Sequence, residues 1–192
     1  MCGRNSDYGR RPPKRYISLN TANKLTMVRV AIIPVFLIVL YLGFPGSNYV
    51  AMGLFVLAGL TDIADGQIAR KRSQVTDFGK FTDPLADKVL VVAAMLWFVE
   101  KGTFPTWAAF LVIVREFMVT ALRLIAVGNG RVIAAAVSGK IKTAVTMVCL
   151  TAMFLPLTLW MIYICIGAIT VTTLISGAEY FIRNREMLKL GR

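Results

Sequence analysis

The sequence predicts an all-α integral membrane protein with six transmembrane helices, and three observations support this prediction. Of the 192 residues, 57% are hydrophobic, and the mean hydropathy of +0.66 exceeds what a soluble domain of this length needs to fill its core. The charged residues are confined to segments between long uncharged stretches. When six spans are drawn through those stretches, all but Lys101 of the 22 lysines and arginines fall on one side.

Glycines and prolines divide the uncharged stretches into separate helices. Residues 30–61 carry no charge, but the segment from Gly43 to Asn48 ends one helix and begins another. Residues 143–178 are also uncharged and suffice for two crossings of about 18 residues each, with Pro156 at the hairpin. The first expected span begins at residue 30; the next three cover 48–72, 84–99 and 105–126; Gly139 opens the fifth and Arg183 closes the sixth.

Two features are expected before the first span. Residues 1–16 are basic, contain Pro12 and Pro13 and have little apolar surface, which predicts a disordered arm ahead of a membrane domain at 17–192. Asn23, Thr26 and Arg29 share one helical face by their i,i+3 spacing. This spacing predicts a short juxtamembrane amphipathic helix, which either contacts a ligand or lies on lipid headgroups.

The distribution of charge predicts the orientation and the partners. Lysine and arginine number 22 against 10 aspartates and glutamates, and the positive-inside rule then places the N- and C-termini in the cytoplasm. Positive charge spread along one membrane face favours anionic membrane lipids as partners and disfavours nucleic acid. With no histidine and three scattered cysteines, neither a zinc site nor a disulfide framework is expected, so any metal must be held by oxygen.

Four aspartates form the most informative pattern. Asp62 and Asp65 share a helical stripe with Gly66, Ala69 and Arg70, near the cytoplasmic end of the second span. A second pair, Asp83 and Asp87, stands at i,i+4 at the start of the third span, where Pro84 suits a first helical turn.

Four carboxylates at membrane-embedded helix ends need compensating positive charge. Two divalent cations, Mg²⁺ or Mn²⁺, would cancel the formal charge, and a pair of such ions is a recurrent device for phosphoryl displacement. The alternative is a set of interfacial salt bridges to Arg70, Lys71, Arg72, Lys80 and Lys88. Charge pairing alone, however, does not account for the small residues Gly66, Ala69 and Gly79, which let a ligand approach the backbone.

The full pattern, Asp62-x2-Asp65-Gly66-x2-Ala69-Arg70-x8-Gly79-x3-Asp83-x3-Asp87, resembles the complete signature of the CDP-alcohol phosphatidyltransferases. Further segments resemble the bacterial phosphatidylglycerophosphate synthases within that family: residues 23–29, Arg115-Glu116-Phe117, Leu122-Arg123 and Gly139-Lys140-Ile141-Lys142-Thr143. The resemblance covers roughly residues 20–187.

The resemblance implies a six-helix fold, usually homodimeric, with its active site at the cytoplasmic face of the cell membrane. It implies that Asp62, Asp65, Asp83 and Asp87 bind two metals that hold the diphosphate of CDP-diacylglycerol, and that Asp87 is also the general base toward sn-glycerol 3-phosphate. It implies that Gly66, Ala69 and Arg70 face the nucleotide. The other residues expected to bind CDP-diacylglycerol are Asn23, Thr26, Thr61 and Gly79.

A phosphorylated acceptor is a dianion beside an anionic donor, so a second cationic cluster is expected on the cytoplasmic side. The candidates are Arg115, Arg123, Lys140 and Lys142. Arg115 lies about 15 Å into the fourth helix, where its expected partner is a buried anion or Glu116. Glu116 is adjacent in sequence and is expected to point elsewhere on the helix; Arg123, Lys140 and Lys142 alternatively extend to the headgroups.

The expected reaction transfers the phosphatidyl group of CDP-diacylglycerol to sn-glycerol 3-phosphate. One alternative keeps the metal site and changes the acceptor to inositol phosphate, serine or phosphatidylglycerol. A divalent-cation transporter is an alternative of another class, but its site is expected near the bilayer midplane, between repeats that this sequence lacks. A passive membrane scaffold leaves the four acids unexplained.

Overall fold

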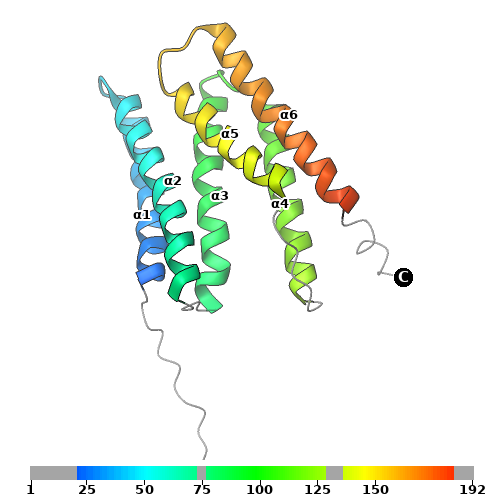
Figure 1. The fold of residues 1–192 in the computed structure, drawn as a ribbon. Helices are drawn as coiled ribbons and strands as arrows, with labels where there is room; N and C mark the ends of the chain where they lie inside the picture. Colours follow the sequence, from blue (N-terminus) through cyan, green and yellow to red (C-terminus); the bar gives the residue numbers. More distant parts are fainter. Residues whose placement is uncertain (1–20, 73–76, 129–135, 184–192) are drawn as a thin grey trace, which may run out of the picture.

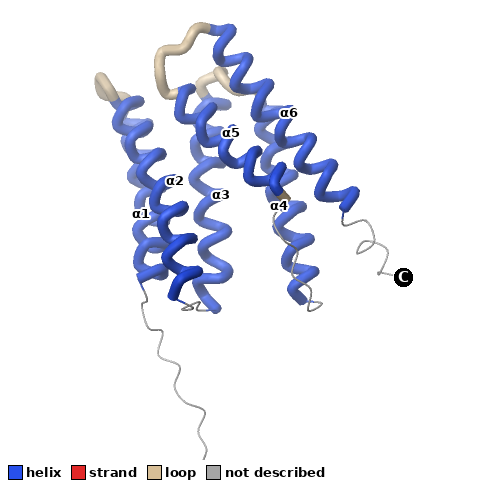
Figure 2. Tube along the Cα trace, viewed as in Figure 1, coloured by secondary structure: helices blue, strands red, loops and turns tan. Residues whose placement is uncertain are grey.

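The computed structural model describes the backbone of residues 21–72, 77–128 and 136–183; for residues 21–30, 62–72, 77–87 and 124–128 it describes the helical backbone but not the side chains. The predicted arm at residues 1–16 lies outside the described residues. The described part of the chain is all-helical, with no strand (Figure 2). Its six helices are α1 (Thr21–Leu42), α2 (Ser47–Arg72), α3 (Asp77–Glu100), α4 (Thr106–Gly128), α5 (Val137–Met153) and α6 (Leu159–Arg183).

Successive helices run in alternating directions (Figure 1). The short connections at 43–46, 101–105 and 154–158 gather at one end of the molecule, which we call the short-loop end. Gly43, Gly46 and Gly102 have φ values of 60°, 91° and 70° there, a conformation that favours glycine. The predicted helix breaks at these glycines and at Pro156 are therefore confirmed. The C-terminal end of α2 and the N-terminal end of α3 lie at the opposite end, which we call the aspartate end.

Two predicted helix starts are wrong. Asn23, Thr26 and Arg29 do not form a separate juxtamembrane helix but lie in the first turns of α1, which continues through Pro34 to Leu42. Nothing between residues 23 and 30 interrupts the helix, since that segment contains neither glycine nor proline. Likewise α3 begins at Asp77, so Pro84 lies beyond its first turn; a proline removes one backbone hydrogen bond without necessarily ending a helix.

The helices pack around an aromatic centre nearer the short-loop end. Phe154 contacts Phe36, Phe55 and Phe98, with ring centroids 5.9, 6.0 and 4.8 Å away. Around this centre α1 packs against α2 and α3, α5 packs against α6, and α4 packs against α6 and α3. The core thereby connects the helices that carry the aspartates to the helices that carry the cationic candidates.

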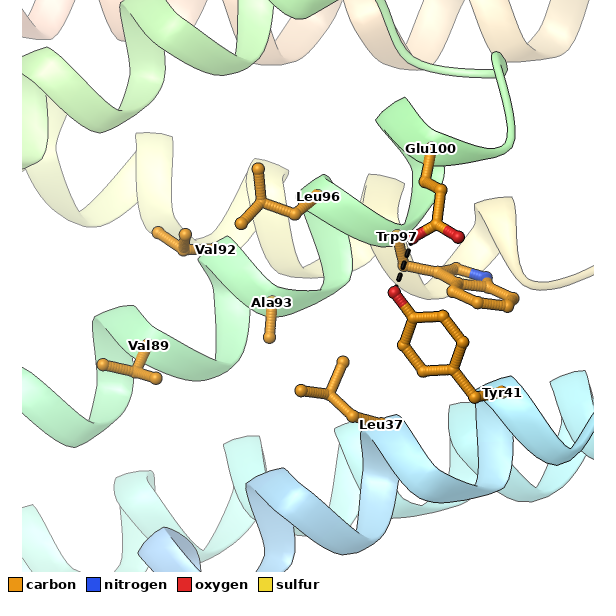
Figure 3. A pocket seen from close by; sticks show the side chains of 8 residues that line it. All are labelled: Leu37, Tyr41, Val89, Val92, Ala93, Leu96, Trp97 and Glu100. Carbon is orange, nitrogen blue, oxygen red and sulfur yellow. Dashed lines mark hydrogen bonds between the residues drawn. The ribbon is translucent and has the colours of Figure 1, made fainter.

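A mostly apolar pocket between α1 and α3 extends along α3 from Val89 to Glu100 at the short-loop end (Figure 3). At its polar edge the hydroxyl of Tyr41 donates a hydrogen bond of 2.5 Å to Glu100, and the Tyr41 ring stands edge-on to Trp97. The same Trp97 ring is covered by Lys101, whose Nζ lies 4.4 Å from the ring centroid. The pocket contains none of the predicted site residues, although Val89 at its other edge lies two residues after Asp87 on α3.

By length and apolar composition, one helix within the described part of the chain, α6 at Leu159–Arg183, suffices to cross a bilayer. Shorter apolar helical stretches are found at Ala31–Leu42 and Ser47–Thr61. Large apolar side chains are nevertheless exposed on all six helices, which is the surface expected of helices that face lipid. They include Ile38, Leu57, Leu96, Phe110, Val148 and Val171.

Candidate active site

The backbone brings the two aspartate pairs to the same end of the molecule. Asp62 and Asp65 lie in the last turns of α2, and Asp83 and Asp87 lie in the first turns of α3. Asp62 is about 15 Å along the axis from the end of α2, and Asp87 is about 15 Å from the start of α3, at ~1.5 Å per residue. Because α2 and α3 are in contact and antiparallel, the two pairs occupy similar levels (Figure 1).

The side chains of the four aspartates lie outside the described residues, as do those of Asn23, Thr26, Gly66, Ala69, Arg70 and Gly79. Of the donor-site candidates, Thr61 is described. Its hydroxyl donates to the carbonyl of Leu57 at 2.5 Å and lies 3.1 Å from that of Ala58, within the same helix. Its oxygen therefore keeps only acceptor capacity toward a ligand.

Gly59, one turn before Asp62, lies against the side chain of Met147 on α5. A Cβ atom added to Gly59 would collide with the terminal methyl of Met147. The end of the Met147 side chain thus occupies the space beside Gly59, where α2 and α5 are in contact.

A second group of charged residues meets around a single carboxylate on α4. Lys142 donates to Oε1 of Glu116 at 2.7 Å, and Arg115 donates to the same oxygen at 2.9 Å. Nζ of Lys88 lies 3.6 Å from Oε2, and Lys88 also donates to the hydroxyl of Thr120. Arg115 further donates to Ser176 of α6. We call these six residues from four helices the Glu116 cluster: Lys88, Arg115, Glu116, Thr120, Lys142 and Ser176.

The cluster is buried and carries excess positive charge. The side chains of Lys142, Arg115 and Glu116 are 3%, 12% and 18% exposed. Among the side chains that the structure describes, three cations surround one carboxylate, which leaves a formal charge of +2. Buried uncompensated charge is costly, so such a cluster is suited to an anion carrying two negative charges.

Buried donors remain available in this region. Nε of Arg115 and Oγ of Ser138 are buried and have no hydrogen-bond partner among the described residues. Arg115 also lies against two glycines, because a Cβ on Gly177 would stand 3.4 Å from its Cγ and one on Gly139 would stand 3.6 Å from its Nη2. Buried polar groups are normally satisfied, so unused donors beside a net positive cluster indicate a ligand site.

The structure separates the four predicted acceptor residues into two groups. Arg115 and Lys142 meet at Glu116, whereas Arg123 is exposed, with its guanidinium 5.9 Å from the Tyr180 ring centroid, and Lys140 is exposed at the start of α5. The alternative in which Lys142 extends to the headgroups is wrong, because the side chain is buried and paired. Glu116 as a partner of Arg115 is confirmed, and the expectation that it points elsewhere on the helix is wrong.

The sequence did not indicate that four further residues lie near Arg115 and Lys142, namely Lys88, Thr120, Ser138 and Ser176. Lys88 and Glu116 are 28 positions apart, and Arg115 and Ser176 are 61 apart, so no local spacing connects them. The one available signal was Glu116 itself, the one acidic residue of α4.

Fold and site together define a class of protein. It is a helical protein with exposed apolar helix faces, two adjacent helices that carry aspartates, and a buried cationic cluster. The family model described as CDP-alcohol phosphatidyltransferase matches residues 19–175. This chain belongs to the CDP-alcohol phosphatidyltransferase family.

Individual relatives cover most of the chain. It is 40% identical to the CDP-diacylglycerol--glycerol-3-phosphate 3-phosphatidyltransferase of Bacillus subtilis strain 168, over 88% of this chain and 97% of the relative. It is 37% identical to the probable phosphatidylglycerophosphate synthase of Mycobacterium tuberculosis strain H37Rv, over 85% of this chain and 81% of the relative. An enzyme of Haemophilus influenzae, named as in B. subtilis, is 44% identical over 66% of this chain and 70% of its own.

Proposed function

We propose that the protein transfers the phosphatidyl group of CDP-diacylglycerol to sn-glycerol 3-phosphate, giving phosphatidylglycerophosphate and CMP, as a step of phosphatidylglycerol biosynthesis. The observation that carries this proposal is the Glu116 cluster, whose formal charge of +2 and unused donors complement a phosphate dianion. The relatives in B. subtilis and H. influenzae bear the name of this reaction.

The cluster discriminates between classes of acceptor alcohol. Serine, a zwitterion, would leave the two excess positive charges of the cluster uncompensated, whereas a phosphomonoester neutralises them. Arg115 and Lys142 would contact the acceptor phosphate directly, and Arg123 and Lys140 would line the exposed approach to it. Inositol phosphate shares the dianion, and the names of the relatives favour glycerol 3-phosphate over it.

The aspartates fit two divalent cations. Four carboxylates from adjacent helix ends, in a chain without histidine, form the all-oxygen ligand set that Mg²⁺ or Mn²⁺ prefers. When bound, such ions neutralise the donor diphosphate and stabilise the departing CMP. Gly66, Ala69 and Gly79 leave space for the nucleotide, and Asn23, Thr26, Thr61 and Arg70 contact CDP-diacylglycerol.

Asp87 would supply the base. Its carboxylate accepts the proton of the primary hydroxyl of glycerol 3-phosphate, and the freed oxygen then forms a bond to the lipid-linked phosphorus while the bond from that phosphorus to the bridging oxygen breaks. Holding the acceptor phosphate in the Glu116 cluster keeps the hydroxyl beside that phosphorus.

We propose that all six helices cross the cell membrane, with both termini and the active site on the cytoplasmic side and a homodimer as the working form. Tryptophan and tyrosine mark the other interface: Trp97, Trp107 and Trp160 lie close to the short-loop end, as do Tyr41 and Tyr49. Aromatic belts of this kind form at membrane–water boundaries. Arg115 and Glu116 lie near the middle of α4, and Lys142 lies in the second turn of α5, toward the opposite boundary.

The test is the release of CMP by purified protein from CDP-diacylglycerol with Mg²⁺ or Mn²⁺ present. Release is expected with glycerol 3-phosphate and not with inositol phosphate, serine or phosphatidylglycerol. Preference for one of the other alcohols contradicts the acceptor assignment. Ion flux in proteoliposomes without nucleotide, together with no CMP release, contradicts the enzymatic assignment.

A further inference from the structure

Glu116 holds three cations that come from three different helices. Lys142 of α5 and Arg115 of α4 share its Oε1 at 2.7 and 2.9 Å, while Lys88 of α3 approaches its Oε2 at 3.6 Å. The backbone carbonyl of Glu116 accepts a hydrogen bond from Thr120 at 2.7 Å, and Thr120 is itself contacted by Lys88. One residue therefore connects α3, α4 and α5 at the place where the acceptor phosphate is proposed to bind.

We propose that Glu116 is the positioning residue of the acceptor site, a carboxylate that assembles Lys88, Arg115 and Lys142 into a receptor for the phosphate of the acceptor alcohol. The inference rests on the proposed function, since it deepens the account of that same site. Glu116 does not contact the reacting atoms. It acts by fixing the cations that contact the acceptor.

The charge of Glu116 is what makes this arrangement stable. Without it, three like charges within a few ångströms would repel one another in a region where Lys142 is 3% exposed. The lysine would then move away or lose its proton, and either change removes a contact to the phosphate. A carboxylate in an anion site thus strengthens anion binding, although its own charge opposes it.

Glu116 also links the acceptor site to the aspartates. Lys88 follows Asp87 directly on α3, so the contacts of Lys88 with Glu116 and Thr120 tie this part of α3 to α4. The position of Asp87 relative to the acceptor phosphate consequently depends on the same carboxylate.

The experiment compares Glu116→Gln and Glu116→Asp with the wild-type enzyme in CMP release, varying each substrate in turn. Glu116→Gln is expected to raise KM for glycerol 3-phosphate about tenfold or more, with KM for CDP-diacylglycerol changed about twofold at most. Glu116→Asp keeps the charge and is expected to recover part of the loss. Glu179→Gln is the matched control, because it removes the carboxylate of an exposed ion pair with Arg183 on α6.

The possible outcomes distinguish a failure of the positioning role of Glu116 from a failure of the proposed function. An unchanged or lowered KM for glycerol 3-phosphate in Glu116→Gln overturns the positioning role, and so does an equal rise in both KM values. If the wild-type enzyme uses a different acceptor, the proposed function fails, and the same KM comparison with that acceptor decides the role of Glu116. Melting temperature and size-exclusion profile in detergent establish that each variant is folded.

Discussion

Replacing Lys142 with methionine tests whether the cationic cluster binds the acceptor. Methionine keeps most of the length and apolar volume of the lysine stem and removes the ammonium group, which lies 2.7 Å from Glu116. The variant leaves Glu116 with two cationic partners, Arg115 at 2.9 Å and Lys88 at 3.6 Å. The carboxylate is therefore not left uncompensated in the protein interior.

The structure sets the size of the expected effects of Lys142→Met on stability and on catalysis. At 2.7 Å the lysine and the carboxylate attract each other by about 6 kcal/mol at an effective dielectric constant of ~20. Desolvation of a lysine that is 3% exposed offsets most of this attraction, so we expect the free energy of unfolding to change by about 1 kcal/mol or less. The acceptor phosphate, in contrast, loses a charge-assisted hydrogen bond of about 1.5–3 kcal/mol. This loss lowers kcat/KM for glycerol 3-phosphate by about 10- to 150-fold.

The assay is CMP release at saturating CDP-diacylglycerol and divalent cation, with glycerol 3-phosphate varied, beside thermal unfolding of the same preparations. Lys101→Met is the control, because Lys101 lies at the short-loop end over the Trp97 ring. It should retain wild-type kinetics. A Lys142→Met enzyme with wild-type kcat/KM, or one that loses stability and activity toward both substrates alike, would refute the reasoning.

Three further predictions concern the base, the metal ions and the contact between Gly59 of α2 and Met147 of α5. Asp87→Asn should lower CMP release by about 10²–10⁴-fold, the usual contribution of a positioned base, without changing the melting temperature by more than a few degrees; normal turnover would exclude Asp87 as the base. Treatment with EDTA should abolish CMP release and added Mg²⁺ or Mn²⁺ should restore it, whereas full activity in EDTA would exclude the metal site. Gly59→Leu should lower the free energy of unfolding by about 1–3 kcal/mol through its collision with Met147, measured by thermal unfolding, and Met147→Ala in the same chain should recover part of that loss.

The number of helices and their turns could be predicted because each depends on local chemistry. Uncharged stretches indicate the helices, and Gly43, Gly46 and Gly102 occupy backbone conformations that other residues avoid. The start of α3 could not be placed, because Pro84 is compatible with both a first turn and a helix interior. The packing of α4 against α6 could not be predicted either, since apolar faces in a membrane protein do not specify their partners.

The candidate site likewise has one part that the sequence predicts and one part that it does not. The aspartate pattern is local enough to be visible in the sequence, because each pair lies within two turns of one helix. The Glu116 cluster depends on contacts between distant segments. Adjacent residues on a helix diverge by about 100°, which led to the prediction that Glu116 points away from Arg115. The long arginine side chain spans that angle and reaches Oε1 at 2.9 Å.

Charge balance explains why a site for two anionic substrates contains five acidic residues. Under the proposed function, four aspartates offset two divalent cations, and the two excess positive charges of the Glu116 cluster offset the acceptor phosphate. The acceptor half is then close to neutral when loaded, which a poorly solvated site at a membrane boundary requires. The aspartate half also receives the negative charge of the donor diphosphate, toward which Arg70 is proposed to supply a positive charge. The halves meet on α3, where Asp87 and Lys88 are consecutive residues. A shift of α3 would therefore move the base and Lys88 together relative to Arg115 and Lys142, which lie on α4 and α5, so the contacts of Lys88 with Glu116 and Thr120 matter for the distance between base and acceptor.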